Sequence, residues 1–130
     1  MFSPQDLSPD GTQILGLYFD DQAAVGGRRV VVVPVGGRGT VHKLDMLIDV
    51  PQVAWAPDAR AITYVRRADG VANLWRQPLD GGQPTQLTNF PAGSGNIPCH
   101  AWSRDGKWLA LVRAVPQRQL VLLRDAGGRG

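Results

Sequence analysis

Residues 53–89 read VAWAPDARAITYVRRADGVANLWRQPLDGGQPTQLTN, and this stretch contains one complete structural unit whose parts recur before and after it. A four-residue turn recurs around three aspartates, Asp10, Asp58 and Asp105, whose numbers differ by 48 and 47. A Gly-Gly pair begins at Gly36, Gly81 and Gly127, with differences of 45 and 46. Two landmarks that share nearly one period indicate a true repeat, and a period of about 20–50 residues is typical of solenoids, propellers and arrays.

The repeat unit is predicted to consist of short β-strands. Turns of the Ser-Pro-Asp-Gly kind suit a type I β-turn, and the apolar runs after them are too short for helices. These runs are Ile14–Phe19, Ala61–Val65 and Leu109–Val112, then Arg29–Val33, Asn73–Leu79 and Gln119–Leu123. Weaker strands are expected at Thr40–Met46 and Pro84–Leu87, and short first strands are expected within Met1–Leu7 and ending at Trp55 and at Trp102. Val, Ile, Leu, Tyr and Trp between Gly, Pro and Asp are the strand signature.

When the repeats are aligned on the aspartate, both faces of the second strand are apolar. One column holds Ile14, Ile62 and Leu109, and a column on the opposite face holds Leu17, Val65 and Val112. A four-stranded sheet that is covered on both faces by its neighbours is a propeller blade. The prediction is therefore an all-β, partial β-propeller of about two and three-quarter four-stranded blades in a single domain, 1–130. Blade one is assigned to 1–50, blade two to 51–97 and an incomplete blade three to 98–130.

The repeat closely resembles that of the TolB-like β-propeller family, which is related to WD repeats. Blade two carries the resemblance through Trp55, Pro57, Asp58, Asp80, Gly81, Gly82, Leu87 and Thr88, and blade three through Trp102, Ser103, Asp105 and Gly106. The departures are Leu7 in the Trp column, Val35 in place of the Leu-Asp pair, Ala59 in place of the turn glycine, and Arg104 in place of proline. Blades two and three also resemble the C-terminal propeller of certain bacterial Ser/Thr protein kinases and winged-helix regulators. These resemblances imply part of a bacterial signalling protein or of a TolB-like envelope protein.

Length and composition limit the alternatives. The 130 residues include one cysteine, Cys99, so an internal disulfide is excluded, and the compartment stays open. No apolar stretch is long enough to span a membrane, and no signal peptide is recognised at the start. Closed propellers have four to eight blades. We therefore expect a fragment of a longer propeller or, less favoured, a protomer that self-associates through its open blade faces.

Side chains that suggest chemistry are each explained better by structure. Asp10, Asp58 and Asp105 are expected to bond their own turns, a blade apart from one another. Cys99 and His100 point to opposite faces of a strand and form no nucleophile–base pair; a small core cysteine beside a partly buried histidine is expected. His42 stands without the further His or Cys that a metal site needs.

The remaining motifs are likewise predicted to be structural. Gly36–Thr40 lacks the features of a phosphate loop, and Asn89–Asn96 contains no nucleophile elbow. The pairs Arg28-Arg29 and Arg66-Arg67 are expected on a solvated rim rather than in a nucleic-acid stripe. Of the tryptophans, which could stack on a sugar or a base, Trp55 and Trp102 are expected to pack between blades because they recur by position, whereas Trp75 and Trp108 are left open.

The function expected from the sequence is a non-catalytic scaffold or sensor that binds a protein, a peptide or a small ligand at its loop rim. No catalytic residue, cofactor, metal ligand or nucleic-acid partner is expected. One alternative is the propeller cap of a prolyl-oligopeptidase-like hydrolase whose catalytic domain lies elsewhere. Another is a self-assembling, lectin-like ring. Fold alone does not decide among them.

Overall fold

The computed structural model describes residues 2–19, 28–48, 52–93, 95–114 and 118–124, and within these ranges it holds eleven strands, one 3₁₀ turn and no α-helix. The first antiparallel sheet contains β1 (Phe2–Leu7), β2 (Gln13–Phe19), β3 (Arg28–Pro34) and β4 (His42–Ile48). The second contains β5 (Val53–Trp55), β6 (Ala61–Ala68), β7 (Val71–Pro78) and β8 (Thr85–Gln86). The third contains β9 (Asn96–Trp102), β10 (Trp108–Ala114) and β11 (Arg118–Arg124).

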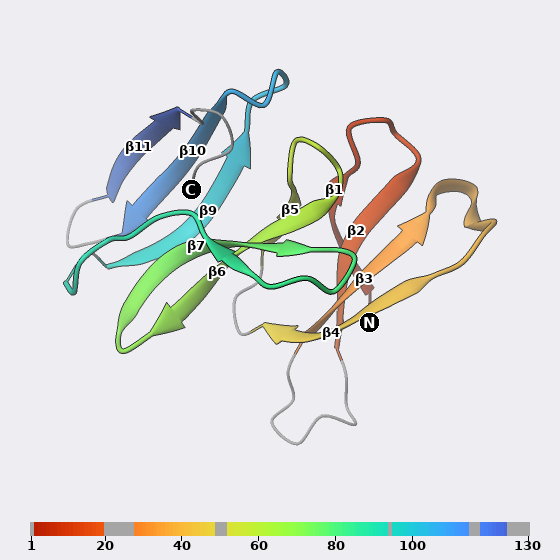
Figure 1. Ribbon diagram of the computed structural model, residues 1–130, viewed down its shortest axis with the longest axis horizontal. Coiled ribbons are helices and arrows are strands. Elements are labelled where there is room, and N and C mark those ends of the chain that lie inside the picture. The colour runs from red at the N-terminus through yellow and green to blue at the C-terminus, as the bar shows by residue number, and fades with distance from the viewer. Residues whose placement is uncertain (1, 20–27, 49–51, 94, 115–117, 125–130) are drawn as a thin grey trace.

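Strand order in the sheets confirms the predicted architecture (Figure 1). The four-stranded sheets have the orders β1-β2-β3-β4 and β5-β6-β7-β8, and the three-stranded sheet has the order β11-β10-β9. Every pairing is antiparallel and joins neighbours in the chain. Each sheet is thus one meander, which is the form of a propeller blade. We call the sheets blades one, two and three.

The predicted strands are confirmed, with ends that shift by a few residues. The largest shift is in β6, which continues to Ala68 and turns into β7 through Asp69 and Gly70. Both turn residues have positive φ, 54° and 75°, as a two-residue hairpin of the favoured twist requires. Pro34 is the last residue of β3, where its missing N–H costs least. The predicted loop 20–27 and the third Gly-Gly pair lie outside the described residues.

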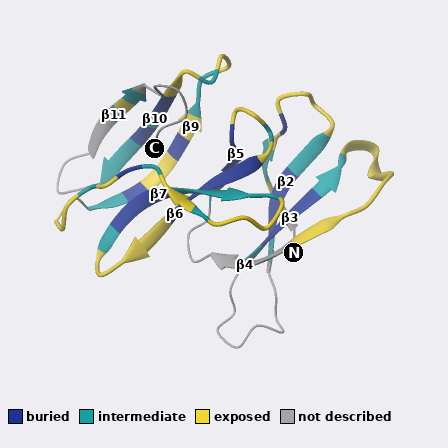
Figure 2. Cartoon of the chain, viewed as in Figure 1, coloured by how far each residue is buried: buried dark blue, intermediate teal, exposed yellow. Residues whose placement is uncertain are grey.

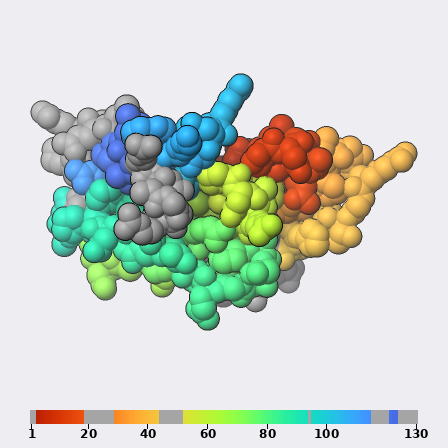
Figure 3. Space-filling model, turned by 45° about the horizontal axis from the view of Figure 1, so that its top comes forward, coloured from red at the N-terminus to blue at the C-terminus, as the bar shows by residue number. Residues whose placement is uncertain are grey.

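The three blades follow one another across the molecule in chain order (Figure 3). Contacts between sheets run from β1 and β2 to β5, and from β7 to β9. Two apolar clusters fill the two seams. Figure 2 marks the buried residues on the strands of the blades. The first cluster consists of Leu15, Leu17, Val30, Val32, Val53, Trp55, Ile62 and Tyr64. The second consists of Val65, Ala72, Leu74, Ile97, Leu109 and Leu111.

The aligned columns take the positions that the repeat predicts. Ile62 faces blade one and Val65 faces blade three, so the second strand of blade two is buried on both faces. Leu17 and Leu109 belong to the same two seams, from the blades on either side. The repeat therefore sets how blades stack, because equivalent residues fill equivalent seams.

The recurring turns confirm the type I prediction. Amide groups of Gly11, Ala59 and Gly106 donate to the carbonyls of the residues three positions before them, over 2.9, 2.9 and 3.0 Å. All three have positive φ, of 76°, 59° and 73°. Glycine adopts this conformation without strain, whereas alanine does so at a cost of about 1–2 kcal/mol.

Ala59→Gly is therefore expected to stabilise the protein by up to about 1 kcal/mol in urea unfolding. The gain is smaller than the full strain because the Ala59 methyl packs against the first cluster. Ala68→Gly is the matched control: it removes a methyl from an exposed strand position of ordinary φ and should cost about 0.5–1 kcal/mol. Equal losses in both variants would contradict the strain at residue 59.

Gly106→Ala should destabilise the protein more than the equivalent change in blade one. A Cβ at Gly106 would lie 2.7 Å from the Cβ of Pro57 in the neighbouring turn, whereas a Cβ at Gly11 would meet nothing within 4 Å. We expect Gly11→Ala to cost about 1–2 kcal/mol for its φ alone, and Gly106→Ala about 2–3 kcal/mol because the turns must also move apart. Urea melts of the two variants, measured side by side, give this difference. Equal losses would mean that the two turns do not touch.

Candidate functional site

The three repeat aspartates stabilise their own turns, as predicted. Each carboxylate accepts a hydrogen bond from the amide two residues later, at 3.0 Å for Asp10, 2.9 Å for Asp58 and 3.0 Å for Asp105. The turns that carry them join β1 to β2, β5 to β6 and β9 to β10, along the upper side of the view in Figure 1. We call this edge the turn rim. The aspartates lie on three separate turns, which is the arrangement expected for structural groups.

The second partner of each carboxylate depends on whether a serine stands two residues before the aspartate. In blades one and three a serine hydroxyl donates to the aspartate, Ser8 to Asp10 at 2.7 Å and Ser103 to Asp105 at 2.6 Å. These hydroxyls, together with the backbone amides, lower the pKa of Asp10 and of Asp105. Blade two has Ala56 at the serine position.

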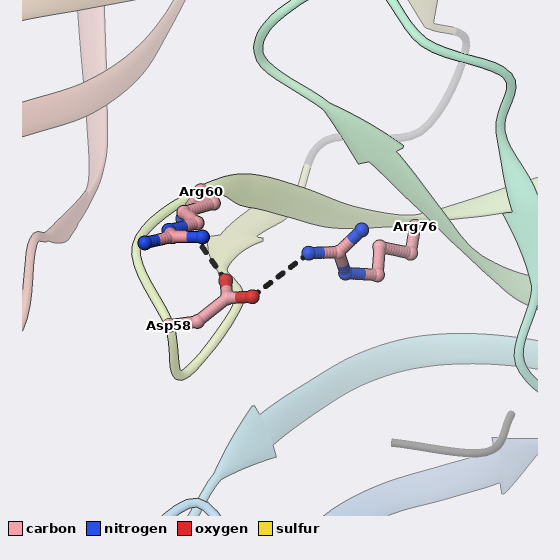
Figure 4. Close-up of polar contacts among 3 residues, drawn as sticks. All are labelled: Asp58, Arg60 and Arg76. Atoms are coloured by element: carbon pink, nitrogen blue, oxygen red, sulfur yellow. Dashed lines mark hydrogen bonds and ion pairs between the residues drawn. The ribbon is translucent and has the colours of Figure 1, made fainter.

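Without that serine, Asp58 pairs with an arginine instead (Figure 4). One oxygen accepts from the amide of Arg60, and the other lies 2.9 Å from a terminal nitrogen of Arg76 on β7. The Arg76 side chain is 31% exposed and that of Asp58 is 50% exposed. An ion pair this exposed contributes little to stability, about 0–1 kcal/mol. Its role is to give Asp58 the second partner that a serine hydroxyl gives the other two aspartates.

Cys99 and His100 lie on opposite faces of β9, as strand alternation predicts, but their expected burial was wrong for both. Cys99 is exposed, and His100 is only 4% exposed. His100 shares its face with Trp102, two residues later, and that face packs on blade two. Cys99 lies on the face turned away from blade two. The pair therefore has no shared side from which to act together.

Around His100, a buried polar cluster joins blade two to blade three. Its Nε2 lies 2.8 Å from Oγ1 of Thr63 on β6, and Thr63 is fully buried. The indole Nε1 of Trp102 donates to the same hydroxyl over 3.3 Å, and that hydroxyl is 3.5 Å from the carbonyl of Ala54. We call Thr63, His100 and Trp102 the seam cluster. Sequence reasoning missed it, although the predicted inward position of Trp102 also places His100 inward.

The hydrogen bonds of the seam cluster define which nitrogen of His100 carries the proton. Oγ1 of Thr63 can accept from Trp102 and from His100 Nε2–H while donating to the Ala54 carbonyl. Nδ1 of His100 is buried and has no hydrogen-bond partner. Protonation at Nδ1 would create a buried donor without an acceptor, and burial lowers the pKa of His100 to about 4. The ring is therefore neutral at pH 7 and serves as a structural group.

The first strand of each blade, which we call its innermost strand, lies at an edge of its sheet. Side chains from the preceding segment of the chain form hydrogen bonds with the backbone groups of the innermost strands β5 and β9. Asp6 on β1 accepts from the amide of Trp55 at 2.8 Å, across the first seam. Across the second seam, the Gln52 amide group donates to the carbonyl of His100 at 2.7 Å and accepts from its amide at 3.0 Å. An edge strand leaves such groups unpaired unless a neighbour supplies partners. Each blade thus completes the innermost strand of the next.

A second buried network fixes the connection from blade two to blade three. Thr88 donates to the side-chain oxygen of Asn73 at 2.7 Å and accepts from the amide of Leu74 at 3.0 Å. The same Asn73 oxygen accepts from the amide of Phe90 at 2.7 Å. Asn73 in the middle of an apolar strand was the sequence signal for this network, because asparagine is unfavourable there without partners.

Three arginines lie near the ends of β6 and β10, opposite the turn rim, with Arg66 over a ring of the first seam and Arg113 over a ring of the second. The Arg66 guanidinium lies 5.0 Å from the ring centre of Trp75, and that of Arg113 lies 4.9 Å from the ring centre of Phe90. Arg67 donates to the side chain of Asn96 at 3.3 Å, beside the start of blade three. We call Arg66, Arg67 and Arg113 the arginine rim. Arg66-Arg67 was predicted on a rim, whereas Arg113 and the aromatic supports of the rim were not recognised.

The other predicted residues have structural positions. Trp55 is buried in the first seam and Trp102 packs on the second cluster, as predicted, while Trp75 is partly buried and Trp108 is 43% exposed. Gly36-Gly37 forms a turn, and His42 is exposed. Arg28 has no described side chain. Within the ranges described, no three His, Cys, Asp or Glu residues are grouped to hold a metal ion, and no helix is long and apolar enough to cross a membrane.

Comparison with known proteins supports the fold. No protein-family model matches the chain. An uncharacterised protein of Agrobacterium fabrum is 29% identical over 104 residues, which are 79% of this chain and 33% of that protein. The chain therefore spans about a third of the length of this curated relative.

Solved structures extend the comparison. TolB from Acinetobacter baumannii matches with a TM-score of 0.71 and 21% identity, over 94% of this chain and 29% of that one. A structure assigned to TolB of Agrobacterium tumefaciens matches with a TM-score of 0.75 and 17% identity, over 99% of this chain and 47% of that one. The isopeptidase AtxE2, in its S527A variant with Astexin3-dC4 bound, matches with a TM-score of 0.63 and 18% identity, over 96% and 19%. The fold is TolB-like.

Proposed function

We propose that this chain is a non-catalytic propeller module that binds a protein or peptide partner at the arginine rim. The observation that carries the proposal is the pair of guanidinium groups placed over aromatic rings, Arg66 over Trp75 and Arg113 over Phe90. Arginine and tryptophan are enriched among the residues that dominate binding energy at protein interfaces. A guanidinium held over a ring has already lost much of its side-chain freedom, so less entropy is lost when it binds a carboxylate.

The charge of this rim defines the kind of partner. Arg66 and Arg113 occupy equivalent positions on β6 and β10, and Arg67 bonds to Asn96 in the seam between the same two blades. Asp69 in the β6–β7 hairpin is the acidic residue nearest to Arg66 and Arg67 in the sequence, and Asp105 is the one nearest to Arg113. A partner with aspartate or glutamate side chains would be attracted to this rim and could accept bidentate hydrogen bonds. An acidic peptide segment is the ligand chemistry that fits best.

The placement of the reactive side chains supports a binding role over catalysis. His100 is sealed in the second seam with Thr63, and Cys99 faces the other way. Asp10, Asp58 and Asp105 are used by their own turns. A general base must reach the proton that it removes, and the buried His100 is out of reach of a substrate in solution.

A titration with labelled peptides tests this function. The probes are a fluorescein-labelled peptide of alternating Glu and Gly and a Lys-Gly peptide of equal length, followed by fluorescence anisotropy at low salt. We expect the acidic peptide to bind and the basic one not to bind. Arg66→Gln combined with Arg113→Gln should weaken binding at least about tenfold, because two charge-assisted contacts are lost.

The matched control removes the same charge from the turn rim. Arg60 and Arg104 are exposed arginines there, and Arg60→Gln combined with Arg104→Gln should leave the affinity within about threefold. Equal losses in both double variants would show that only net charge matters and would refute a site at the arginine rim. Far-UV circular dichroism confirms that each variant is folded.

A second candidate function is the propeller cap of a peptidase. It is favoured by the likeness to the AtxE2 isopeptidase, of which the chain matches 19%. The larger protein would then carry the catalytic residues, and the arginine rim would face an entering peptide. The TolB likenesses favour instead a bacterial envelope protein. A signalling protein with a kinase or winged-helix domain is a further proposal, which rests on the resemblance of the repeat alone. Sequencing the transcript on both sides of this reading frame separates them, through a hydrolase, a kinase or winged-helix domain, or further propeller blades.

A further inference from the structure

Each of the three blades holds one cation over an aromatic ring. The pairs are Lys43 over Tyr18, Arg66 over Trp75 and Arg113 over Phe90, with distances from the cationic group to the ring centre of 5.3, 5.0 and 4.9 Å. All three aromatic side chains are partly exposed. Part of each ring is therefore accessible to a ligand beside its cation.

The three pairs stand at equivalent places of the repeat. Tyr18, Arg66 and Arg113 differ in number by 48 and 47, which is the spacing of the repeat aspartates. They lie near the ends of β2, β6 and β10, away from the turn rim (Figure 1). Because stacked sheets lie about 10 Å apart, neighbouring pairs are expected to follow one another at about that interval. The cations Lys43, Arg66 and Arg113 thus form a row across the blades, which we call the cation row.

The interval of the cation row matches one backbone conformation of a bound peptide. A polyproline II helix has three residues per turn and rises about 3.1 Å per residue, so every third side chain points the same way at intervals of about 9.3 Å. A β-strand returns to the same face after two residues, at about 6.6–6.8 Å, which is too short for a step of one blade. An acidic residue at every third position of a polyproline II segment would meet one cation in each blade.

The aromatic rings also favour the polyproline II form. Proline-rich segments are recognised by aromatic side chains that line a groove, and their conformation is already ordered before they bind. Tyr18, Trp75 and Phe90 supply such rings along the cation row. An α-helix returns to one face after seven residues, at about 10.5 Å, but a helix interior excludes the prolines that pack on such rings.

We propose that the partner of the arginine rim is a proline-rich acidic segment in the polyproline II conformation, with a carboxylate at every third residue. This rests on the proposed function and adds the spacing and the conformation of the ligand. Successive carboxylates pair with Lys43, Arg66 and Arg113, the two arginines as bidentate partners and the lysine as a single charge. The prolines between the carboxylates pack beside the rings.

Peptides of one composition test the spacing. Three fluorescein-labelled peptides each contain three Glu and six Pro: Glu-Pro-Pro repeated three times, a peptide with Glu at its first, third and fifth positions, and a peptide that begins with three successive Glu. Length and charge are equal, so fluorescence anisotropy at low salt compares spacing alone. We expect the first peptide to bind at least about ten times more tightly than the other two.

The failure of this proposal differs from the failure of the proposed function. Equal affinities of the three peptides would overturn the spacing. If Arg66→Gln combined with Arg113→Gln still weakened all three, an acidic-peptide site at the arginine rim would stand without it. If none of the three peptides bound, both proposals would be wrong.

A flexible peptide tests the conformation. Glu-Gly-Gly repeated three times keeps the spacing, but its chain is not ordered before it binds. It should bind at least about threefold more weakly than the Glu-Pro-Pro repeat, because more conformational entropy is lost. An equal affinity of the glycine peptide, or a higher affinity of a helical peptide with Glu at every seventh position, would refute the polyproline II form.

Single charge removals test the order of the cations in the row. A peptide of two Glu-Pro-Pro units can bind to Lys43 with Arg66 or to Arg66 with Arg113. Arg66→Gln leaves no two neighbouring cations and should weaken this peptide at least about tenfold. Lys43→Gln leaves one of the two overlapping sites intact and should weaken it only about twofold.

The matched control removes a lysine from the turn rim. Lys107 is exposed there, and Lys107→Gln should leave the affinity for the peptide of two units unchanged. Equal losses for Lys43→Gln and Arg66→Gln, or a loss for Lys107→Gln as large as that for Arg66→Gln, would refute the cation row. Far-UV circular dichroism of each variant confirms that the chain is folded.

Discussion

Replacing Trp55 by alanine is expected to lower the free energy of unfolding by about 3–5 kcal/mol. Trp55 is 3% exposed and belongs to the first cluster, so its removal leaves a cavity in the seam between blades one and two. The cost is set by packing, because the indole Nε1 is buried without a hydrogen-bond partner. The repeat explains why the Trp55 Nε1 has no acceptor. Thr63 accepts from Trp102 in the second seam, and the equivalent residue in the first seam is Leu15, which has no acceptor atom in its side chain.

For Trp102 and Trp108, the expected loss of unfolding free energy decreases as the exposure of the side chain increases. Trp102→Ala should cost about 2–4 kcal/mol, because Trp102 is partly buried and also donates to Thr63. Trp108→Ala, measured by urea unfolding at low protein concentration, should cost less than about 1 kcal/mol, since Trp108 is 43% exposed. A loss below about 1 kcal/mol for Trp55→Ala would remove Trp55 from the core and with it the inter-blade role assigned to this column.

Lowering the pH from 7 to 4 is expected to cost about 3 kcal/mol of stability through His100 alone. The pKa of His100 falls from 6.5 to about 4 in the folded protein because the ring is buried, which corresponds to about 1.36 kcal/mol for each unit of the shift. Between these pH values the unfolded chain binds a proton that the folded chain excludes. Stability from His100 is therefore complete above pH 6.5 and is lost as the pH falls toward 4.

The carboxylates titrate in a different window. The pKa values of Asp10 and Asp105 are lowered from 3.8, so most of the stability that they contribute is lost below that pH. Urea unfolding at a series of pH values between 7 and 4 thus isolates the histidine. A flat profile in this range would show that His100 is not buried in the folded state.

A matched variant follows from the repeat. Leu15 and Val53 occupy in the first seam the columns that Thr63 and His100 occupy in the second. The double variant Thr63→Leu and His100→Val copies this apolar pair, and it should abolish the pH dependence between 7 and 4 while leaving the chain folded at pH 7. If the pH dependence persisted in the double variant, it would have to come from groups other than His100.

Most of the fold was predictable because its information is local and repeated. The turn residues require particular φ values, as Ser8–Gly11 and Asp69-Gly70 show, and apolar residues on both faces identify β6 as a strand buried between two blades. The period then relates one blade to the next, so that a clear signal in blade two located weaker strands such as β1. The burial of Trp55 and Trp102 followed from the same period.

The candidate sites were less predictable because they join residues from different blades. Arg66 was visible as part of a basic pair, but its place over Trp75 depends on how β6 pairs with β7. Cys99 and His100 were assigned the wrong burial because the predicted inward position of Trp102 was not carried over to its neighbours on β9. Residues two apart share a face and adjacent residues do not, so Trp102 places His100 inward and Cys99 outward.

The strands, the turns and the period, and with them the TolB-like partial propeller, follow from the amino-acid sequence, since these depend on φ preferences and on alternation within short segments. The partners across each seam depend instead on how the blades stack. Thr63 and His100 are 37 residues apart and meet because blades two and three stack at one register. The same stacking leaves Leu7 and Leu122 exposed, because each lies on the outer face of the first or the last blade described. Contacts between sheets depend on where whole blades lie relative to one another, and no local pattern of residues encodes that position.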